Sequence, residues 1–357
     1  MFGCDAPTNL AQVCRNWRQA AYDTPYLWRA LQLHLWHFQE GNFTAAENQV
    51  AAARAWLSRS GALPLSIFLH CSTDPTPLAP VLLEAFTLLL SHCSRWEYAY
   101  LMVPAALPAD MTMPALPLLV QLEISVPRLV GGSAVQPLRW LPAPKLRTLD
   151  VRFGKVFPAY VLSPDSWKSL TILRVFGIQW GHAMEALSLA TGLVSCWLQL
   201  HEDRLSRRVL APSGQPLQLY LPHLETLALP ATDPATVQLN RRLLDSLRVP
   251  ALRSLAIDKS FIASYRRSHS VQETAHHFAR LLDKWGCSMT LGRLTLLVWE
   301  QPPADLSDDR GDGLWRNEIH TALPAITDLE FRFNDAPFDE SPLLFGSWEL
   351  NFQVTWR

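Results

Sequence analysis

Histidine residues occur at spacings that invite a test for metal binding or acid–base chemistry. His276 and His277 are adjacent, and His34 lies three residues before His37. Neither pair has a cysteine or carboxylate partner at the spacing that metal sites need, so we interpret these histidines as residues on helix faces. The sequence contains no GxSxG, P-loop or GxGxxG motif. We therefore predict no catalytic, cofactor-binding or metal-binding residues, and we expect that the chain is not an enzyme.

An acidic segment at 308–313, DDRGDG, has the beginnings of an EF-hand calcium loop. Arg310 occupies a ligand position of that pattern, and Ile319 stands where the bidentate glutamate belongs. Because both positions need oxygen ligands, the segment is interpreted as a solvent-exposed acidic loop without a metal.

Composition excludes several classes of protein. Of the 357 residues, 49% are hydrophobic and 18% are charged, which argues against a disordered chain. The formal net charge is −1, so we expect no nucleic-acid partner and no anionic membrane partner. The 6 cysteines lack CxxC spacing and are interpreted as small buried residues in a reducing compartment. With no signal peptide and no apolar run long enough to span a bilayer, we expect a soluble protein of the cytoplasm or nucleus.

Helical patterns dominate the first sixty residues. Apolar residues at helical spacing predict a helix over 10–21, and Thr24-Pro25 then indicates the start of another, with threonine as the cap and proline in the first turn. Thr44-x-x-Glu47 forms a capping box for a third helix that ends at Gly61. This helix turns apolar residues inward at Val50, Ala53 and Leu57. Residues 64–69 alternate like a strand.

These segments resemble a known family. Residues 13–33 (VCRNWRQAAYDTPYLWRALQL) resemble the second half of an F-box of the expanded fungal type. The residues that match are Val13, Cys14, Arg15, Trp17, Arg18, Thr24, Pro25, Leu27 and Trp28. Residues 55–69 (AWLSRSGALPLSIFL) are similar to the segment that joins such F-boxes to leucine-rich repeats. The residues that match there are Trp56, Leu57, Arg59, Ser60, Gly61, Pro64 and Leu65.

The resemblance implies binding to the adaptor subunit of a cullin–RING ubiquitin ligase. The residues expected to bind the adaptor are Leu10, Val13, Cys14, Trp17, Leu27 and Trp28. Family members begin with a Leu-Pro-x-Glu helix and a further apolar segment, for which residues 1–9 leave no room, so we expect an F-box truncated at its N-terminus. An alternative remains open: Trp17 and Trp28 cap the open end of a repeat array.

A leucine pattern, L-x-x-L-x-[LIV], recurs from residue 116 onward. Its copies are Leu119, Leu122 and Ile124; Leu146, Leu149 and Val151; Leu170, Leu173 and Val175; Leu193, Cys196 and Leu198; Leu224, Leu227 and Leu229; Leu252, Leu255 and Ile257; Leu294, Leu297 and Trp299; and Ile326, Leu329 and Phe331. One such repeat cannot bury its apolar face, but stacked neighbours can. The pattern therefore predicts an α/β fold, an irregular leucine-rich-repeat solenoid of parallel strands with helices or loops on its convex side.

Segments between the copies complete this prediction. Helices are expected at 81–90, 182–193 and 271–285, and residues 95–101 look like an earlier irregular repeat. The expected domains are an all-helical partial F-box at 1–36, a linking helix at 37–63 and the repeat array at 64–357. The tryptophans expected at core positions are Trp17, Trp28, Trp56 and Trp96.

Strand parity predicts the side chains that face a partner. Alternate residues of a strand point to opposite faces, so we expect an exposed set that contacts an unknown protein substrate. Its members are Glu123, Asp150, Arg174, Ala228 and Glu330. The first hypothesis is a substrate-recognition subunit of an SCF-type ligase. The second is a leucine-rich-repeat binding scaffold with a non-functional F-box remnant.

Overall fold

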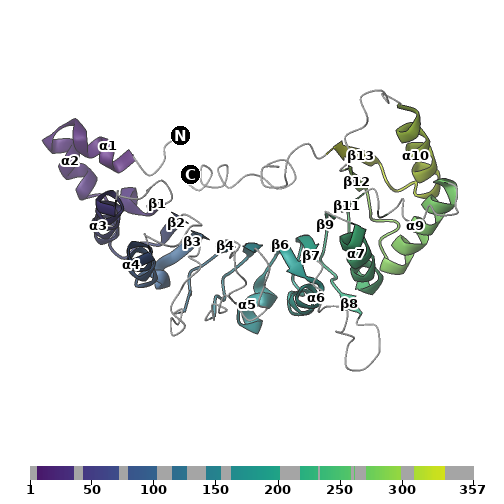
Figure 1. Cartoon of the computed structure of the whole chain (residues 1–357), viewed down its shortest axis with the longest axis horizontal. Helices are drawn as coiled ribbons and strands as arrows, with labels where there is room; N and C mark the ends of the chain where they lie inside the picture. Colours follow the sequence, from purple (N-terminus) through teal and green to yellow (C-terminus); the bar gives the residue numbers. More distant parts are fainter. Residues whose placement is uncertain are drawn as a thin grey trace. The chain divides into compact units, whose positions relative to one another are not determined.

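The chain consists of two α/β units, each built on a parallel sheet (Figure 1). The computed structural model describes residues 6–35, 43–71, 79–102, 115–126, 142–153, 162–201, 218–231, 234–258, 261, 271–298 and 309–333. The first unit contains the described residues up to Ser166, and the second contains those from Trp167 onward. Helix α5 (Pro164–Ser169) contains the point of division.

Five strands of the first unit pair in chain order, and each neighbouring pair is parallel. They are β1 (Ala30–Leu35), β2 (Leu65–Cys71), β3 (Trp96–Met102), β4 (Gln121–Val126) and β5 (Thr148–Phe153). Parallel strands need long crossovers, which here contain α3 (Phe43–Arg59) between β1 and β2, and α4 (Ala79–Leu90) with η2 (Cys93–Arg95) between β2 and β3. Helices α1 (Ala6–Val13), α2 (Arg15–Tyr22) and η1 (Pro25–Trp28) precede β1.

The core of the first unit lies between one face of the sheet and helices α3 and α4 (Figure 1). Strand register aligns two rows of buried residues on that face: Leu31, Ile67, Ala99, Leu122 and Leu149, and Leu33, Leu69, Leu101, Ile124 and Val151. From α3 the predicted residues Val50, Ala53 and Leu57 are buried, as expected. Gly61 takes a φ of 58°, the left-handed conformation that ends a helix and favours glycine.

The second unit repeats the arrangement. Its sheet strands, in spatial order, are β6 (Ile172–Gln179), β7 (Ser195–His201), β9 (Thr226–Leu229), β11 (Ser254–Asp258), β12 (Arg293–Val298) and β13 (Asp328–Phe333). Two short strands, β8 (Leu219–Tyr220) and β10 (Leu247–Arg248), form a separate parallel pair. Its other helices are α6 (Trp180–Leu189), α7 (Pro234–Ser246), α9 (Val271–Trp285) and α10 (Asp309–Ala322). The helices expected at 81–90, 182–193 and 271–285 correspond to α4, α6 and α9.

The residues of the leucine pattern in and directly before β4, β5, β6, β7, β9 and β11 are buried. The copy of the pattern in β12 was predicted in the wrong frame. In β12, Leu294 pairs with Leu255 and Leu296 pairs with Ile257, so the repeat there is Leu291-x-x-Leu294-x-Leu296. The segment contains leucines in both frames, and only pairing with β11 decides between them. Trp299, which belonged to the wrong frame, lies outside the described residues.

The same spacing also occurs nearer the N-terminus, in β3, where residues 95–101 were predicted to be an earlier irregular repeat, and in β1, where no repeat was predicted. Trp96, Ala99 and Leu101 in β3 have the spacing of the repeat and are fully buried. Trp28, Leu31 and Leu33 repeat it at β1, where each is at most 5% exposed. Tryptophan in place of the first leucine concealed the copy at β1, although a buried tryptophan fills the same core position.

Local structure in the first 36 residues differs from the predicted all-helical segment. Cys14 is extended, with φ −160° and ψ 175°, and it divides the expected helix over 10–21 into α1 and α2. Thr24 does not cap the next helix with its side chain. Its hydroxyl donates to the Ala20 carbonyl oxygen at 2.7 Å, and a 3₁₀ helix follows. Residues 30–35 then form strand β1, because Leu31 and Leu33 complete the buried rows of the sheet.

The acidic segment at 309–313 was predicted to be a loop and is instead the start of helix α10. Asp308 lies outside the described residues.

Candidate functional site

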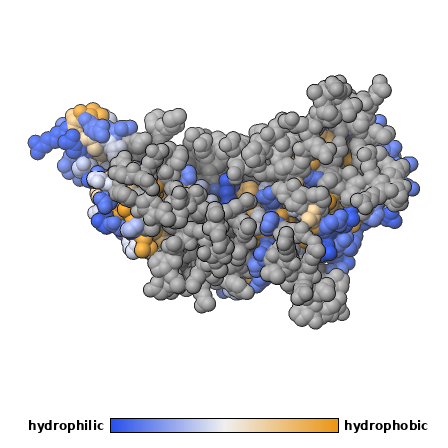
Figure 2. Space-filling model, viewed as in Figure 1, coloured by the Kyte–Doolittle hydropathy of each residue, from blue (hydrophilic) through white to orange (hydrophobic). Residues whose placement is uncertain are grey.

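Apolar side chains are exposed where the chain begins its first unit. Val13 in α1 is 66% exposed, Trp17 in α2 is 53% exposed, and Tyr26 in η1 is 61% exposed. Figure 2 shows hydrophobic surface, in orange, among hydrophilic residues at the end of the unit that contains α1 and α2. We call Val13, Trp17 and Tyr26 the N-terminal apolar surface. Exposed tryptophan and tyrosine side chains are typical of protein-binding surfaces.

The break at Cys14 positions the residues of this surface. The Arg18 amide donates to the Cys14 carbonyl and starts α2, while its Nε donates to the Ala11 carbonyl oxygen of α1 at 2.8 Å. Carbonyls in the last turn of a helix lack partners within the helix, so Arg18 both satisfies α1 and joins it to α2. Val13 and Trp17 therefore lie on two short helices held together by one arginine. Cys14 itself is exposed, contrary to the expectation that the cysteines are buried.

Trp28, although predicted to bind the adaptor, is a core residue. It is 1% exposed, its Nε1 donates to the Ala21 carbonyl oxygen at 2.7 Å, and its ring meets Trp56 edge-on at 4.8 Å between centroids. Trp28 packs at the first strand, as the alternative interpretation requires, whereas Trp17 is exposed and does not. Leu10 and Leu27 are half-buried.

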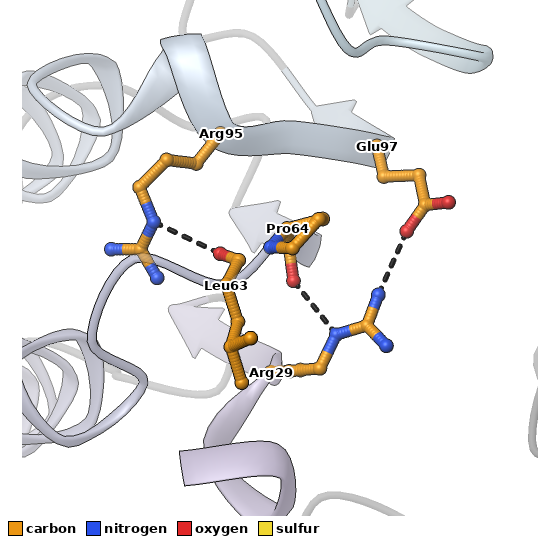
Figure 3. A network of polar contacts seen from close by, with 5 residues as sticks. All are labelled: Arg29, Leu63, Pro64, Arg95 and Glu97. Carbon is orange, nitrogen blue, oxygen red and sulfur yellow. Dashed lines mark hydrogen bonds and ion pairs between the residues drawn. The ribbon is translucent and has the colours of Figure 1, made fainter.

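Two arginine side chains bond the segment before β1 and the turn after α3 to β3 and its preceding turn (Figure 3). Arg29 Nε donates to the Pro64 carbonyl oxygen at 2.9 Å, and its Nη2 forms an ion pair with Glu97 of β3 at 2.8 Å. Arg95 Nε donates in parallel to the Leu63 carbonyl oxygen at 2.9 Å. Its Nη2 also donates to the buried Ser60 hydroxyl at 2.7 Å. The residues before β1 are thus bonded to the turn after α3 and to β3.

The comparison with protein families concerns the same segment. Residues 8–34 match the F-box-like family model. No curated protein matches the chain. The match extends from α1 through β1, and it supports the predicted F-box resemblance.

The F-box-like segment therefore serves two roles in one stretch of chain. Its first part, α1 and α2, presents Val13 and Trp17 to solvent. Its last part contributes Trp28, Leu31 and Leu33 to the buried core of the first unit. Because β1 pairs with β2 along its whole length, the F-box-like segment and the sheet form one packed structure within this unit.

The predicted substrate-facing residues lie in register, as strand parity requires. Glu123 is aligned with Asp150 in the first unit, and the aligned row of the second unit contains Arg174, Ala228 and Glu330. Their expected exposure was wrong for three of them: Glu123 is 1%, Asp150 2% and Ala228 1% exposed. Arg174 and Glu330 are half-buried. Parity assigns a face, but it does not measure how deeply neighbouring side chains cover it.

Pairing with a cation explains how two carboxylates are tolerated at such low exposure. Arg152 Nε lies 3.4 Å from Glu123 Oε1 and 3.8 Å from Asp150 Oδ1. Removing a charge from water is costly unless it is paired, and Arg152 supplies a charge of opposite sign. Burial raises the pKa of the neighbouring Tyr100, as does the negative charge of Glu123. The phenol thus stays protonated at neutral pH.

Aromatic residues on the same face were missed by the sequence analysis. Phe68 of β2 stacks on Tyr100 of β3, with 4.4 Å between centroids and 12° between planes. His34 lies 5.4 Å from the Phe68 ring, and His70 lies 6.2 Å from it. They occupy the strand positions that alternate with the buried rows. Parity places Phe68 on this face once 64–69 is taken as a strand, whereas His34 could be found only by recognising 30–35 as a strand.

The described part of the chain has neither a metal-ligating cluster nor a membrane-spanning helix. These residues contain no cluster of three or more His, Cys, Asp or Glu side chains that could hold a metal ion. None of the helices placed here has the length and hydropathy to cross a membrane. Cys71, Cys93, Cys196 and Cys287 are buried free thiols, as predicted. Burial raises the pKa of Cys71 and Cys287 to about 12, which makes both thiols weak nucleophiles.

Proposed function

We propose that this chain is the substrate-recognition subunit of an SCF-type ubiquitin ligase. In this proposal the F-box-like segment binds the ligase adaptor, and the sheet face holds a protein target. The chain performs no chemistry itself, because the other ligase subunits transfer ubiquitin. The observation that carries the proposal is that a segment matching the F-box-like model exposes Val13 and Trp17 while its other end is built into the sheet. The expected location is the cytoplasm or the nucleus.

The N-terminal apolar surface supports adaptor binding. Tryptophan and tyrosine are over-represented among the residues that contribute most to binding, and they do so when they are buried by the partner. Trp17 and Tyr26 are both more than half exposed in the free chain, so a partner can bury the solvent-accessible surface of both side chains. Trp28 is already buried, so it is excluded from the proposed contact set.

The repeated strands support target binding by a leucine-rich-repeat array. Each repeat contributes one short strand with the L-x-x-L-x-[LIV] spacing, and neighbouring strands are parallel and in register. Such arrays present a broad strand face to a protein partner. In the first unit we propose that Phe68 and Tyr100 contact the target. In the second unit, taken by itself, we propose Arg174 and Glu330 as the target-contacting residues of its own strand face. Glu123 and Asp150 are assigned the role of a buried ion-paired support.

The direct test is co-purification of the full chain with the ligase adaptor from the same cells. Trp17→Asp places a charge in the N-terminal apolar surface and should abolish recovery of the adaptor. Tyr220→Asp provides a matched control, because Tyr220 is also 61% exposed but lies in the second unit. Adaptor recovery that is equal for both variants, or absent with the unmodified chain, would refute the ligase assignment.

A second candidate function is a binding scaffold without ligase attachment. The observation that favours it is the use of Trp28, Leu31 and Leu33 as core residues of the sheet, since residues of the F-box-like segment then stabilise the array whether or not an adaptor binds. Under this function, a target would co-purify with the chain in the absence of adaptor and cullin, and the target would not gain ubiquitin.

A further inference from the structure

One arginine connects helix α3 to the helix that carries Trp17. Arg59 is the last residue of α3. Its guanidinium carbon lies 4.3 Å from the ring centroid of Tyr22, the last residue of α2, and 4.7 Å from the Trp28 ring centroid in η1. A guanidinium over an aromatic face is attracted by the ring, and arginine also stacks on such faces through its plane. Arg59 therefore contacts two aromatic rings from two different elements.

Helix α2 is oriented by its packing on α1, where Arg18 bonds to the Ala11 carbonyl oxygen, and by contacts at its C-terminal end. It is 8 residues long, and Ala21 is its buried residue. Helices of this length are marginal on their own and depend on tertiary contacts. The Trp28 indole bonds to Ala21 and the Thr24 hydroxyl bonds to Ala20, both at the C-terminal end of the helix. Arg59 acts at that same end through the Tyr22 ring.

We propose that Arg59 is a positioning residue for adaptor binding. This inference rests on the proposed function, and it adds a residue that touches neither the adaptor nor the exposed surface of Trp17. The guanidinium clamps Tyr22 and Trp28, and the clamp holds α2 in the orientation that presents Trp17. When the clamp is removed, α2 occupies other orientations for part of the time. The apparent dissociation constant then rises in inverse proportion to the fraction of chains in which α2 keeps the competent orientation.

The experiment replaces the guanidinium while preserving bulk. Arg59→Met keeps an unbranched apolar side chain between the rings, and Arg59→Lys restores a charge without the planar group. Arg54→Met is the matched control, because Arg54 is on the same helix and pairs at the surface with Glu84. Each full-length variant is measured for its adaptor dissociation constant and for hydrogen exchange at the amides of α2 and of β3.

Arg59→Met should weaken adaptor binding by about fivefold, the effect expected from losing partly exposed cation–π contacts. Arg59→Lys should recover part of that loss, and Arg54→Met should change binding by less than about twofold. Exchange at residues 15–22 should accelerate in Arg59→Met, while exchange in β3 stays unchanged. This local acceleration separates a positioning role from general destabilisation.

The contrary results are distinct. If the unmodified chain binds no adaptor, both the proposed function and the positioning role fail. If it binds and Arg59→Met binds equally well, the ligase assignment stands and the positioning role fails alone. If Arg59→Met accelerates exchange throughout the first unit to the same extent, Arg59 is a general structural residue and the inference is overturned.

Discussion

Replacing Trp17 and Trp28 by alanine should have opposite consequences, although the two tryptophans looked equivalent in the sequence. Trp28 is 1% exposed and donates a hydrogen bond to Ala21, whereas Trp17 is 53% exposed. Buried tryptophan-to-alanine substitutions cost roughly 3–5 kcal/mol of unfolding free energy. Trp28→Ala should therefore destabilise the chain by about 4 kcal/mol. Trp17→Ala should change stability by less than about 0.5 kcal/mol, as surface substitutions usually do.

The two tryptophans should also differ in their effect on adaptor affinity, and here the larger loss is expected from Trp17→Ala. Truncation of an interface tryptophan that contributes strongly costs at least about 2 kcal/mol, which corresponds to roughly 30-fold in the dissociation constant. Trp17→Ala should show this loss while it remains folded. Trp28→Phe keeps an aromatic ring beside Trp56 and loses the indole hydrogen bond, so it should cost about 1 kcal/mol of stability and retain adaptor binding.

Urea unfolding followed by far-ultraviolet circular dichroism measures the stability of each variant, and titration calorimetry with purified adaptor measures the affinity. The reasoning is refuted if Trp17→Ala lowers the unfolding midpoint as far as Trp28→Ala does. It is also refuted if Trp28→Ala is as stable as the unmodified chain, because a buried ring cannot be removed without a cavity cost.

Further predictions concern the second unit and the thiols. Leu291→Ala should cost about 2–5 kcal/mol, because Leu291 is fully buried in the corrected repeat, whereas Met289→Ala should be neutral because Met289 is 84% exposed; equal unfolding midpoints for the two would contradict the corrected frame. Because burial raises the Cys71 pKa to about 12, the folded chain retains a thiol proton that the unfolded chain loses near pH 9. Stability should then fall as pH rises from about 9 toward 12, and Cys71→Ala should make the fall shallower in pH-dependent urea titrations. A thiol reagent at neutral pH should label exposed Cys14 before Cys71; the reverse order would contradict the assigned burial.

Much of the fold could be read from leucine spacing because a repeat places the same residue type at the same core position in each strand. Leu122, Leu149 and Leu255 were recognised for that reason, and all are buried in register. The pattern failed at Trp28, where tryptophan replaced the first leucine. It also failed in β12, where a leucine-rich strand fits two frames and only pairing with a neighbour selects one.

The candidate site was less predictable than the fold. Helical periodicity grouped Val13 and Trp17 on one stripe, but an extended residue at Cys14 divides the helix, and a single backbone angle is not visible in a hydrophobic pattern. Parity correctly assigned Glu123 and Asp150 to the face opposite the buried rows. It could not show that both are buried beside Arg152, since that depends on side chains from neighbouring strands.

Assembly of the ligase from purified components tests the central claim most directly. The full chain is mixed with adaptor, cullin and RING subunit, and the mass of the resulting complex is measured by light scattering during gel filtration. The account predicts one complex that contains a single copy of the chain, and it predicts that the Trp17→Asp chain elutes separately from the other subunits. An unmodified chain that elutes alone while the other subunits assemble would contradict it.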